Sequence, residues 1–251
     1  ANAPGKRAYV DFLRQRHGDF AALPGTYDVA ANSWEQLPGD GFERVMLADH
    51  RVRADDEAFL GHIAETWYTL IGETFRATAP GVPIFGERYK FRDHPPAVLK
   101  AAARWVDAIS LQVGPQVGPA AGPGPDDEAR FDHDAIHAIH QLTGKPVMVC
   151  DHQISFPPDD GSDTLWHRAE SEADAAKLAV DFITTAAAEP WCVGHGWCGL
   201  VDRWDASRAL TKQGIFDRAG EPHAELQRAL ADANRDTSAT RGAEPWQPNR
   251  S

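Results

Sequence analysis

The chain has 251 residues, 42% of them hydrophobic, which is enough to bury one large core or two small ones. It carries 25 Lys and Arg against 37 Asp and Glu, a formal net charge of −12. This balance argues against nucleic acid or an anionic membrane as a partner, because both attract a basic surface. No apolar stretch approaches the roughly 20 residues that span a bilayer. The start Ala1-Asn2-Ala3-Pro4 lacks the apolar core of a signal peptide, so we expect a mature, trimmed or cytosolic chain.

The first third of the chain predicts helix and loop. A helix is expected over 6–17, followed by a Gly/Pro/Asp-rich stretch to about residue 41. A second helix begins at Asp55 and ends before Pro80, with apolar residues at helical spacing. Its apolar positions are Phe59, Ile63, Trp67, Leu70 and Ile71. Because Arg44–Leu47 is the single weak strand candidate, we treat 1–81 as a helical lead-in and loop region.

From residue 82 to 235, short β-branched runs alternate with helical patterns. Strands are predicted over 82–86, 106–112, 146–150 and 192–198, and helices over 97–105, 131–142, 172–187 and 222–234. This alternation predicts an α/β fold with a parallel sheet covered by helices, followed by a flexible polar tail over 236–251. Four βα units are half of an eight-stranded barrel, so either strands are missed or the chain is the C-terminal half of something larger. An open half would expose two sheet edges and invite a partner chain or a second copy.

Polar and aromatic residues follow two of the predicted strands. Asp151 and His152 end one strand, while His195 and Trp197 end the next and Asp202 follows. In parallel α/β proteins the catalytic groups lie where strands end and loops begin. An acid beside imidazoles that hydrogen-bond hydroxyls and an indole that stacks on a sugar ring indicates a sugar-cleaving site.

Several of these segments, in this order, resemble the agarase and β-galactosidase-like (β/α)₈ glycoside hydrolases over about residues 6–234. The segments are Gly86-Glu87-Arg88-Tyr89, Val106 to Ser110, Lys145 to Asp151, Val193 to Trp197 with Asp202, and Lys212 to Pro222. The resemblance implies a TIM-barrel type fold with strands five to eight in this chain. It also implies hydrolysis of a galactose-type or marine polysaccharide without a cofactor, and favours a periplasmic or secreted location.

The resemblance assigns a catalytic role to Asp151. The family's strand-seven acid, usually Glu, is the nucleophile, and Asp151 matches its position with a side chain one methylene shorter. The family's general acid, a Glu at the end of strand four, would lie before Ala1. Retaining enzymes hold their carboxyl groups about 5–5.5 Å apart and inverting ones about 6.5–9.5 Å apart. A shorter Asp could favour inversion or leave a site that binds sugar without cleaving it; alternatively, Asp151 simply caps a loop.

Other residues complete the predicted site. Glu87 could act as the acid with Arg88 orienting it or contacting a sugar, or the two could form an ion pair on the rim. Gln112 is expected to contact the sugar, and Asp49 is another possible second carboxylate. Asp202 with its neighbour Arg203 could bind substrate or hold a loop. The alternative function is a non-catalytic carbohydrate-binding half-barrel that needs a partner.

Other chemistries have weaker signals. His133, His137 and His140 share one helix face and could in principle hold zinc, but an outer-ring helix favours packing, so no metal is predicted. The chain has neither a Gly-rich phosphate loop with Lys-Ser/Thr nor a GxSxG turn, which argues against nucleotide binding and serine-hydrolase chemistry. The three cysteines, Cys150, Cys192 and Cys198, are expected in the core.

Overall fold

A computed structural model describes residues 3–23, 27, 30–39, 50–90, 95–112, 131–157, 169–205 and 208–240. The chain forms two compact units, Ala1–Thr78 with Pro95–Ala102 and Ala79–His94 with Ala103–Ser251. Among the described helices, none combines the length and apolar character needed to cross a membrane. The predicted strand Arg44–Leu47 and the carboxylate of Asp49 lie outside the described residues.

The first unit is helical. It contains α1 Pro4–His17, the short η1 Phe20–Ala22, α2 His50–Thr78 and most of α3 Pro96–Ala103. Its buried cluster comprises Tyr9, Val10, Leu13, Leu23, Tyr27, Ala31, Trp34 and Leu37. The buried carboxylate of Asp55 is satisfied by Arg16 at 2.7 Å, His17 at 2.9 Å and the hydroxyl of Tyr27 at 2.8 Å. Three donors around one carboxylate explain how this charge is tolerated in the core.

The second unit contains a four-stranded parallel sheet in the order β1-β2-β3-β4. The strands are β1 Tyr89–Lys90, β2 Ile109–Gln112, β3 Val147–His152 and β4 Cys192–Trp197. Helices α4 His133–Thr143 and α5 Glu172–Ala188 connect successive strands, and α6 Ala224–Thr240 follows the β5 Arg203–Asp205 and β6 Arg208–Thr211 hairpin. The predicted mixed α/β class with a parallel sheet is confirmed.

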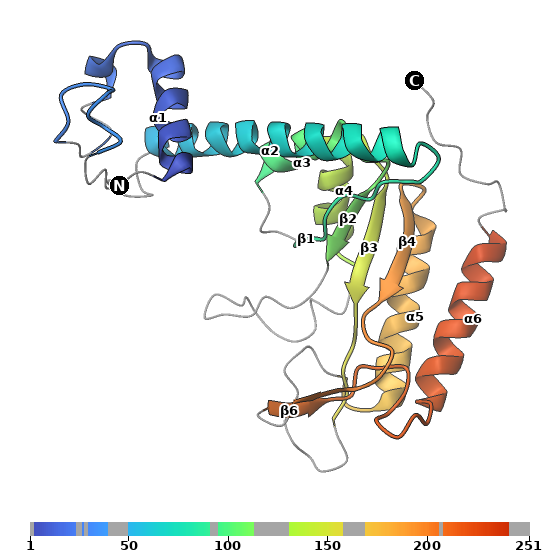
Figure 1. Ribbon diagram of the computed structural model, residues 1–251. Helices are drawn as coiled ribbons and strands as arrows, with labels where there is room; N and C mark the ends of the chain where they lie inside the picture. Colours follow the sequence, from blue (N-terminus) through green and yellow to red (C-terminus); the bar gives the residue numbers. More distant parts are fainter. Residues whose placement is uncertain are drawn as a thin grey trace. The chain divides into compact units, whose positions relative to one another are not determined.

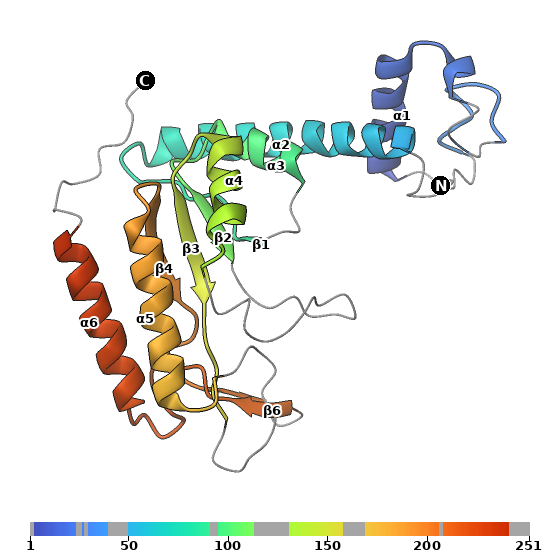
Figure 2. The ribbon, with the colours of Figure 1, turned by 180° about the vertical axis from the view of Figure 1, so that it is seen from behind.

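Helices α4, α5 and α6 lie on one side of the sheet, as the two opposite views show (Figure 1, Figure 2). The cross-strand register assigns residues to sides: Ile109 pairs with Val147 and Leu111 pairs with Val149, and all four are fully buried. We call this the helix-facing side. Gln112 pairs with Cys150 on the opposite side, where Cys150 is only half-buried.

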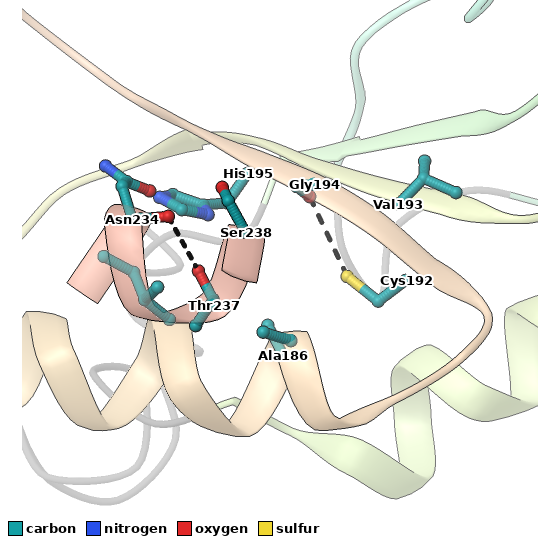
Figure 3. A pocket seen from close by; sticks show the side chains of 10 residues that line it. Ala186, Cys192, Val193, Gly194, His195, Asn234, Thr237 and Ser238 are labelled. Carbon is teal, nitrogen blue, oxygen red and sulfur yellow. Dashed lines mark hydrogen bonds between the residues drawn. The ribbon is translucent and has the colours of Figure 1, made fainter. Parts of the chain in front are cut away.

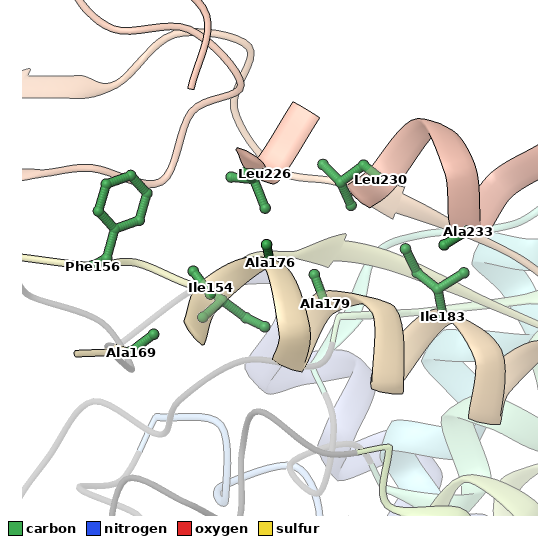
Figure 4. Close-up of a cluster of buried hydrophobic side chains, with 10 residues drawn as sticks. Ile154, Phe156, Ala169, Ala176, Ala179, Ile183, Leu226, Leu230 and Ala233 are labelled. Carbon is green, nitrogen blue, oxygen red and sulfur yellow. The ribbon is translucent and has the colours of Figure 1, made fainter. Parts of the chain in front are cut away.

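The packing of α5 against α6 forms a buried hydrophobic cluster of the second unit (Figure 4). Small residues of α5, such as Ala176 and Ala179, allow Leu226 and Leu230 of α6 to approach closely. The carboxylate of Glu172, in the first turn of α5, accepts hydrogen bonds from two backbone N–H groups at the start of α6. These bonds satisfy two donors that a helix start leaves unpaired.

The structure corrects several predicted boundaries. The strand predicted over 82–86 is wrong, and β1 lies at Tyr89–Lys90 instead. The N–H of Ile84 donates to the side chain of Asp107 at 2.7 Å, and Gly86 turns the chain with a φ of 74°.

Strand β2 begins three residues later than predicted, and β3 extends two residues further. Helix α6 continues to Thr240, so residues 236–240, predicted as tail, are helical. The β5–β6 hairpin was not predicted.

Candidate functional site

Asp151 stands at an irregular point of β3. Between the pairs Val149↔His195 and His152↔Trp197, strand β3 advances three residues while β4 advances two. The extra residue makes a β-bulge, a device that redirects side chains at strand ends. Asp151 has a φ of 62°, the left-handed region, and is the only non-glycine residue with positive φ in the described part of the chain. Asp adopts this conformation more readily than most residues, and such outliers cluster at functional sites.

Arg88 holds the carboxylate of Asp151. Its Nη1 donates to Oδ2 of Asp151 at 2.6 Å, and the side chains are 60% and 14% exposed respectively. Arg88 directly precedes β1, so the ion pair reaches across the intervening strand β2. Gln112, half-buried, is the last residue of β2 and lies on the same side as Cys150. The structure therefore brings Arg88 and Asp151 together and places Gln112 at the end of the strand between them.

Two further residues border this pair and were not predicted as site residues. Cys150, the neighbour of Asp151, is hydrogen-bonded to Ser110, and burial raises the pKa of the Cys150 thiol. Ser110 is buried and pairs with Met148 on the side opposite the helices. Strand alternation from Gln112 back to Ser110 is the signal that could have placed it there. Glu87 is exposed and precedes Arg88 in the chain, outside β1.

His152 lies on the helix-facing side. It is 1% exposed, stacks on Phe182 of α5 with ring centroids 3.7 Å apart, and meets Trp197 edge-on at 5.5 Å. Neither ring nitrogen has a hydrogen-bond partner among the described residues. Burial lowers the pKa of His152 to about 3, and the nearby His195 contributes in the same direction. In this structure His152 is a neutral core residue and is not brought to the carboxylate of Asp151.

The other aromatic candidates share that side of the sheet. Trp197 packs against the α5–α6 cluster and donates its indole N–H to the carbonyl oxygen of Gln213 at 2.9 Å. His195 is half-buried, burial lowers its pKa, and it lines a pocket between β4, α5 and α6. The structure therefore does not bring His195 and Trp197 together with Asp151, the acid of β3, as the sequence had predicted.

Asp202 is a buried structural anchor in this structure. Its Oδ2 contacts Nε2 of His223 at 2.9 Å, and its Oδ1 accepts the N–H of Gly214 at 2.9 Å. A Cβ at Gly214 would lie 2.4 Å from the backbone nitrogen of Asp202, so this close approach requires glycine. Asp202 thus holds the segment before α6 through His223, a residue that we did not predict.

The histidines of α4 pack around Trp191. His137 and His140 stack on the indole with centroids 5.4 Å and 5.6 Å away, and His133 approaches it edge-on at 5.9 Å. Nδ1–H of His140 donates to the carbonyl of Lys145 at 2.8 Å. A hydrogen bond to Asp134, followed by the charge of Glu189, raises the pKa of His133. Within the described ranges, no group of three or more His, Cys, Asp or Glu residues could hold a metal ion.

Comparison with solved structures identifies a shared fold. PfGH50B superposes with a TM-score of 0.76 at 17% identity, covering 95% of this chain and 33% of that one. An exo-β-agarase gives 0.78 at 20% identity, covering 94% and 31%, and the agarase AgWH50C gives 0.76 at 16%, covering 95% and 32%.

No family model matches the chain, and no curated protein matches its sequence. The chain spans about a third of the length of the three structures compared. At these identities the likeness shows the fold alone: the chain has a glycoside hydrolase-like fold.

Proposed function

We propose that this chain is the C-terminal half of a (β/α)₈ glycoside hydrolase that acts on a galactose-type or marine polysaccharide. The observation that carries the proposal is Asp151, a carboxylate in a strained backbone conformation at the carboxyl end of a parallel strand. The shared fold with agarases supports the same reaction class, and the coverage of about a third of their length is consistent with a partial domain.

In this proposal Asp151 is the nucleophile or the base, and Arg88 fixes its orientation. The 2.6 Å ion pair joins Arg88 to Oδ2 of Asp151 and does not involve Oδ1, and the side chain of Arg88 is itself 60% exposed. Gln112, at the end of the intervening strand β2, donates a hydrogen bond to a sugar hydroxyl or accepts one from it. Glu87 is the proposed acid: it protonates the glycosidic oxygen as the bond to the anomeric carbon breaks, and water supplies the hydroxyl of the new reducing end.

The test is hydrolysis of agarose and of a nitrophenyl β-galactoside by the full chain, followed as reducing ends and released nitrophenol. Asp151→Asn keeps the side-chain shape and tolerates the left-handed backbone, so it should abolish turnover while sparing the fold. Asp134→Asn is the matched control because Asp134 lies on α4 with a fully exposed side chain. Turnover by Asp151→Asn equal to that of the control would refute the assignment.

The alternative is a non-catalytic carbohydrate-binding half-barrel that needs a partner chain. The observation favouring it is that Arg88 already occupies one oxygen of Asp151, while strands β1 and β4 each have one neighbour in the described sheet. Binding of agaro-oligosaccharides by the full chain without any turnover, and turnover only after a partner is added, would select this alternative.

A further inference from the structure

A second pocket lies away from Asp151, on the helix-facing side of β4 (Figure 3). Its volume is about 200 Å³, and it is lined by the first half of β4 and the ends of α5 and α6. This is smaller than the roughly 300–1,000 Å³ of pockets for drug-sized ligands. The pocket therefore suits a molecule of the size of one sugar residue or smaller.

Three polar side chains that line this pocket have hydrogen-bonding groups available to a ligand. His195, Asn234 and Ser238 converge in the close-up view, and their side chains make no hydrogen bond among the described residues. By contrast, the hydroxyl of Thr237 donates to the carbonyl of Ala233 at 2.8 Å, and the thiol of Cys192 approaches the carbonyl of Gly194 at 3.8 Å. The first three side chains thus remain available to a ligand.

The chemistry of the lining selects a neutral ligand. An amide, a hydroxyl and an uncharged imidazole each both donate and accept hydrogen bonds. None of the lining residues carries a carboxylate, an ammonium or a guanidinium group. Ile183, Ala186 and Ala187 of α5 add an apolar wall that can contact C–H groups. Hydroxyl groups on a short carbon skeleton match this combination, whereas an ion would lose its hydration without a compensating charge.

We propose that this pocket binds a small neutral polyhydroxylated molecule, held by His195, Asn234 and Ser238. The proposal is independent of the glycosidase assignment, because Asp151 and Arg88 are absent from the lining. Together with the proposed glycosidase site at Asp151, this pocket would give the second unit two separate ligand sites.

The experiment is an NMR titration of the full chain with D-galactose and glycerol as probes and with D-galacturonate as a charged comparison. Saturable shifts of the Gly194, His195 and Ser238 amides, with galacturonate weaker by at least about tenfold, are expected. Shifts confined to Arg88 and Asp151 would report the proposed substrate site and would overturn the proposal for this pocket. The absence of any saturable shift would overturn it as well.

Variants separate binding from folding. Asn234→Leu and Ser238→Ala remove polar partners with residues that favour helices, so the helical circular dichroism should stay unchanged and galactose affinity should fall at least about tenfold. Asp232→Ala is the matched control on α6, since Asp232 is exposed and outside the lining. Unchanged affinity in both pocket variants would overturn the proposal.

Discussion

His152 makes the stability of the second unit depend on pH in a calculable way. Its pKa is about 3 in the folded chain, against 6.5 for an ordinary histidine, because burial disfavours the charged ring. The unfolded chain therefore binds one proton more than the folded chain between these two values. Stability falls as pH decreases through this window, by up to about 1.4 kcal/mol per pH unit. Above pH 7 the ring is neutral in both states and contributes nothing.

The perturbation is His152→Leu, which removes the titrating ring and its two unpaired buried nitrogens while keeping an apolar side chain against Phe182. From the two pKa values, the wild type should lose about 2 kcal/mol between pH 7 and pH 5 through this residue alone. The variant should lack that loss, so the gap between variant and wild type should grow by about 2 kcal/mol in the variant's favour.

The assay is urea denaturation at pH 7 and pH 5, with tryptophan fluorescence as the probe. Trp197 contacts the His152 ring, so its environment reports on this region. His195 has a pKa lowered by burial and is present in both proteins, so its contribution cancels in the difference. An equal pH dependence in wild type and variant, or a His152 proton resonance that titrates near 6.5, would refute the reasoning.

Three other predictions concern stability and are checked by urea denaturation at pH 7. Asp202→Ala leaves His223 and the Gly214 N–H buried without a partner, so it should lower the free energy of unfolding by about 2–5 kcal/mol. Asp202→Asn should lower it by under about 1 kcal/mol, and equal losses in the two variants would contradict this reasoning. Gly214→Ala should cost more than about 3 kcal/mol, while Gly196→Ala, whose added Cβ meets nothing within 4 Å, should cost about 1 kcal/mol or less. Asp151→Ala should be about 1–2 kcal/mol less stable than Asp151→Asn, because alanine resists a φ of 62°; the reverse order would count against backbone strain.

The fold class was predictable because it depends on patterns that are local in the chain. Three of the four predicted strands and the helices between them were found within a few residues. The first strand was predicted over 82–86 because Val82-Pro83-Ile84-Phe85 is apolar. In the structure the backbone N–H of Ile84 donates to the side chain of Asp107, so it is not available for hydrogen bonding to a neighbouring strand. That contact joins residues 23 positions apart, and no local pattern reveals it.

Helix α2 illustrates the difference between recognising a helix and knowing what it packs against. Its apolar spacing correctly predicted the helix, but Ile63, Trp67 and Leu70 are 48%, 49% and 63% exposed. The fully buried positions are smaller or more polar, such as Ala64 and Asp55. Periodicity reports the geometry of a helix, whereas burial depends on elements distant in sequence.

The candidate site was predicted in part because strand ends can be located, but strand faces cannot once a bulge intervenes. Strict alternation from Val149 would place Asp151 on the helix-facing side and His152 on the other. The extra residue in β3 reverses this, so that His152 instead pairs with Trp197 beside α5. A one-residue irregularity therefore moved His152 to the helix-facing side, away from the acid that it was predicted to accompany.

The same bulge bears on why residue 151 is an aspartate where the resemblance implies a glutamate. A residue with a φ of 62° is more often Asp or Asn than Glu, so the left-handed backbone itself favours the shorter side chain. The position of the carboxylate then depends on the bulge and on Arg88 as well as on side-chain length. Side-chain length alone is therefore a poor guide to whether the proposed enzyme retains or inverts. The separation between Asp151 and a second carboxyl group is the quantity that decides it.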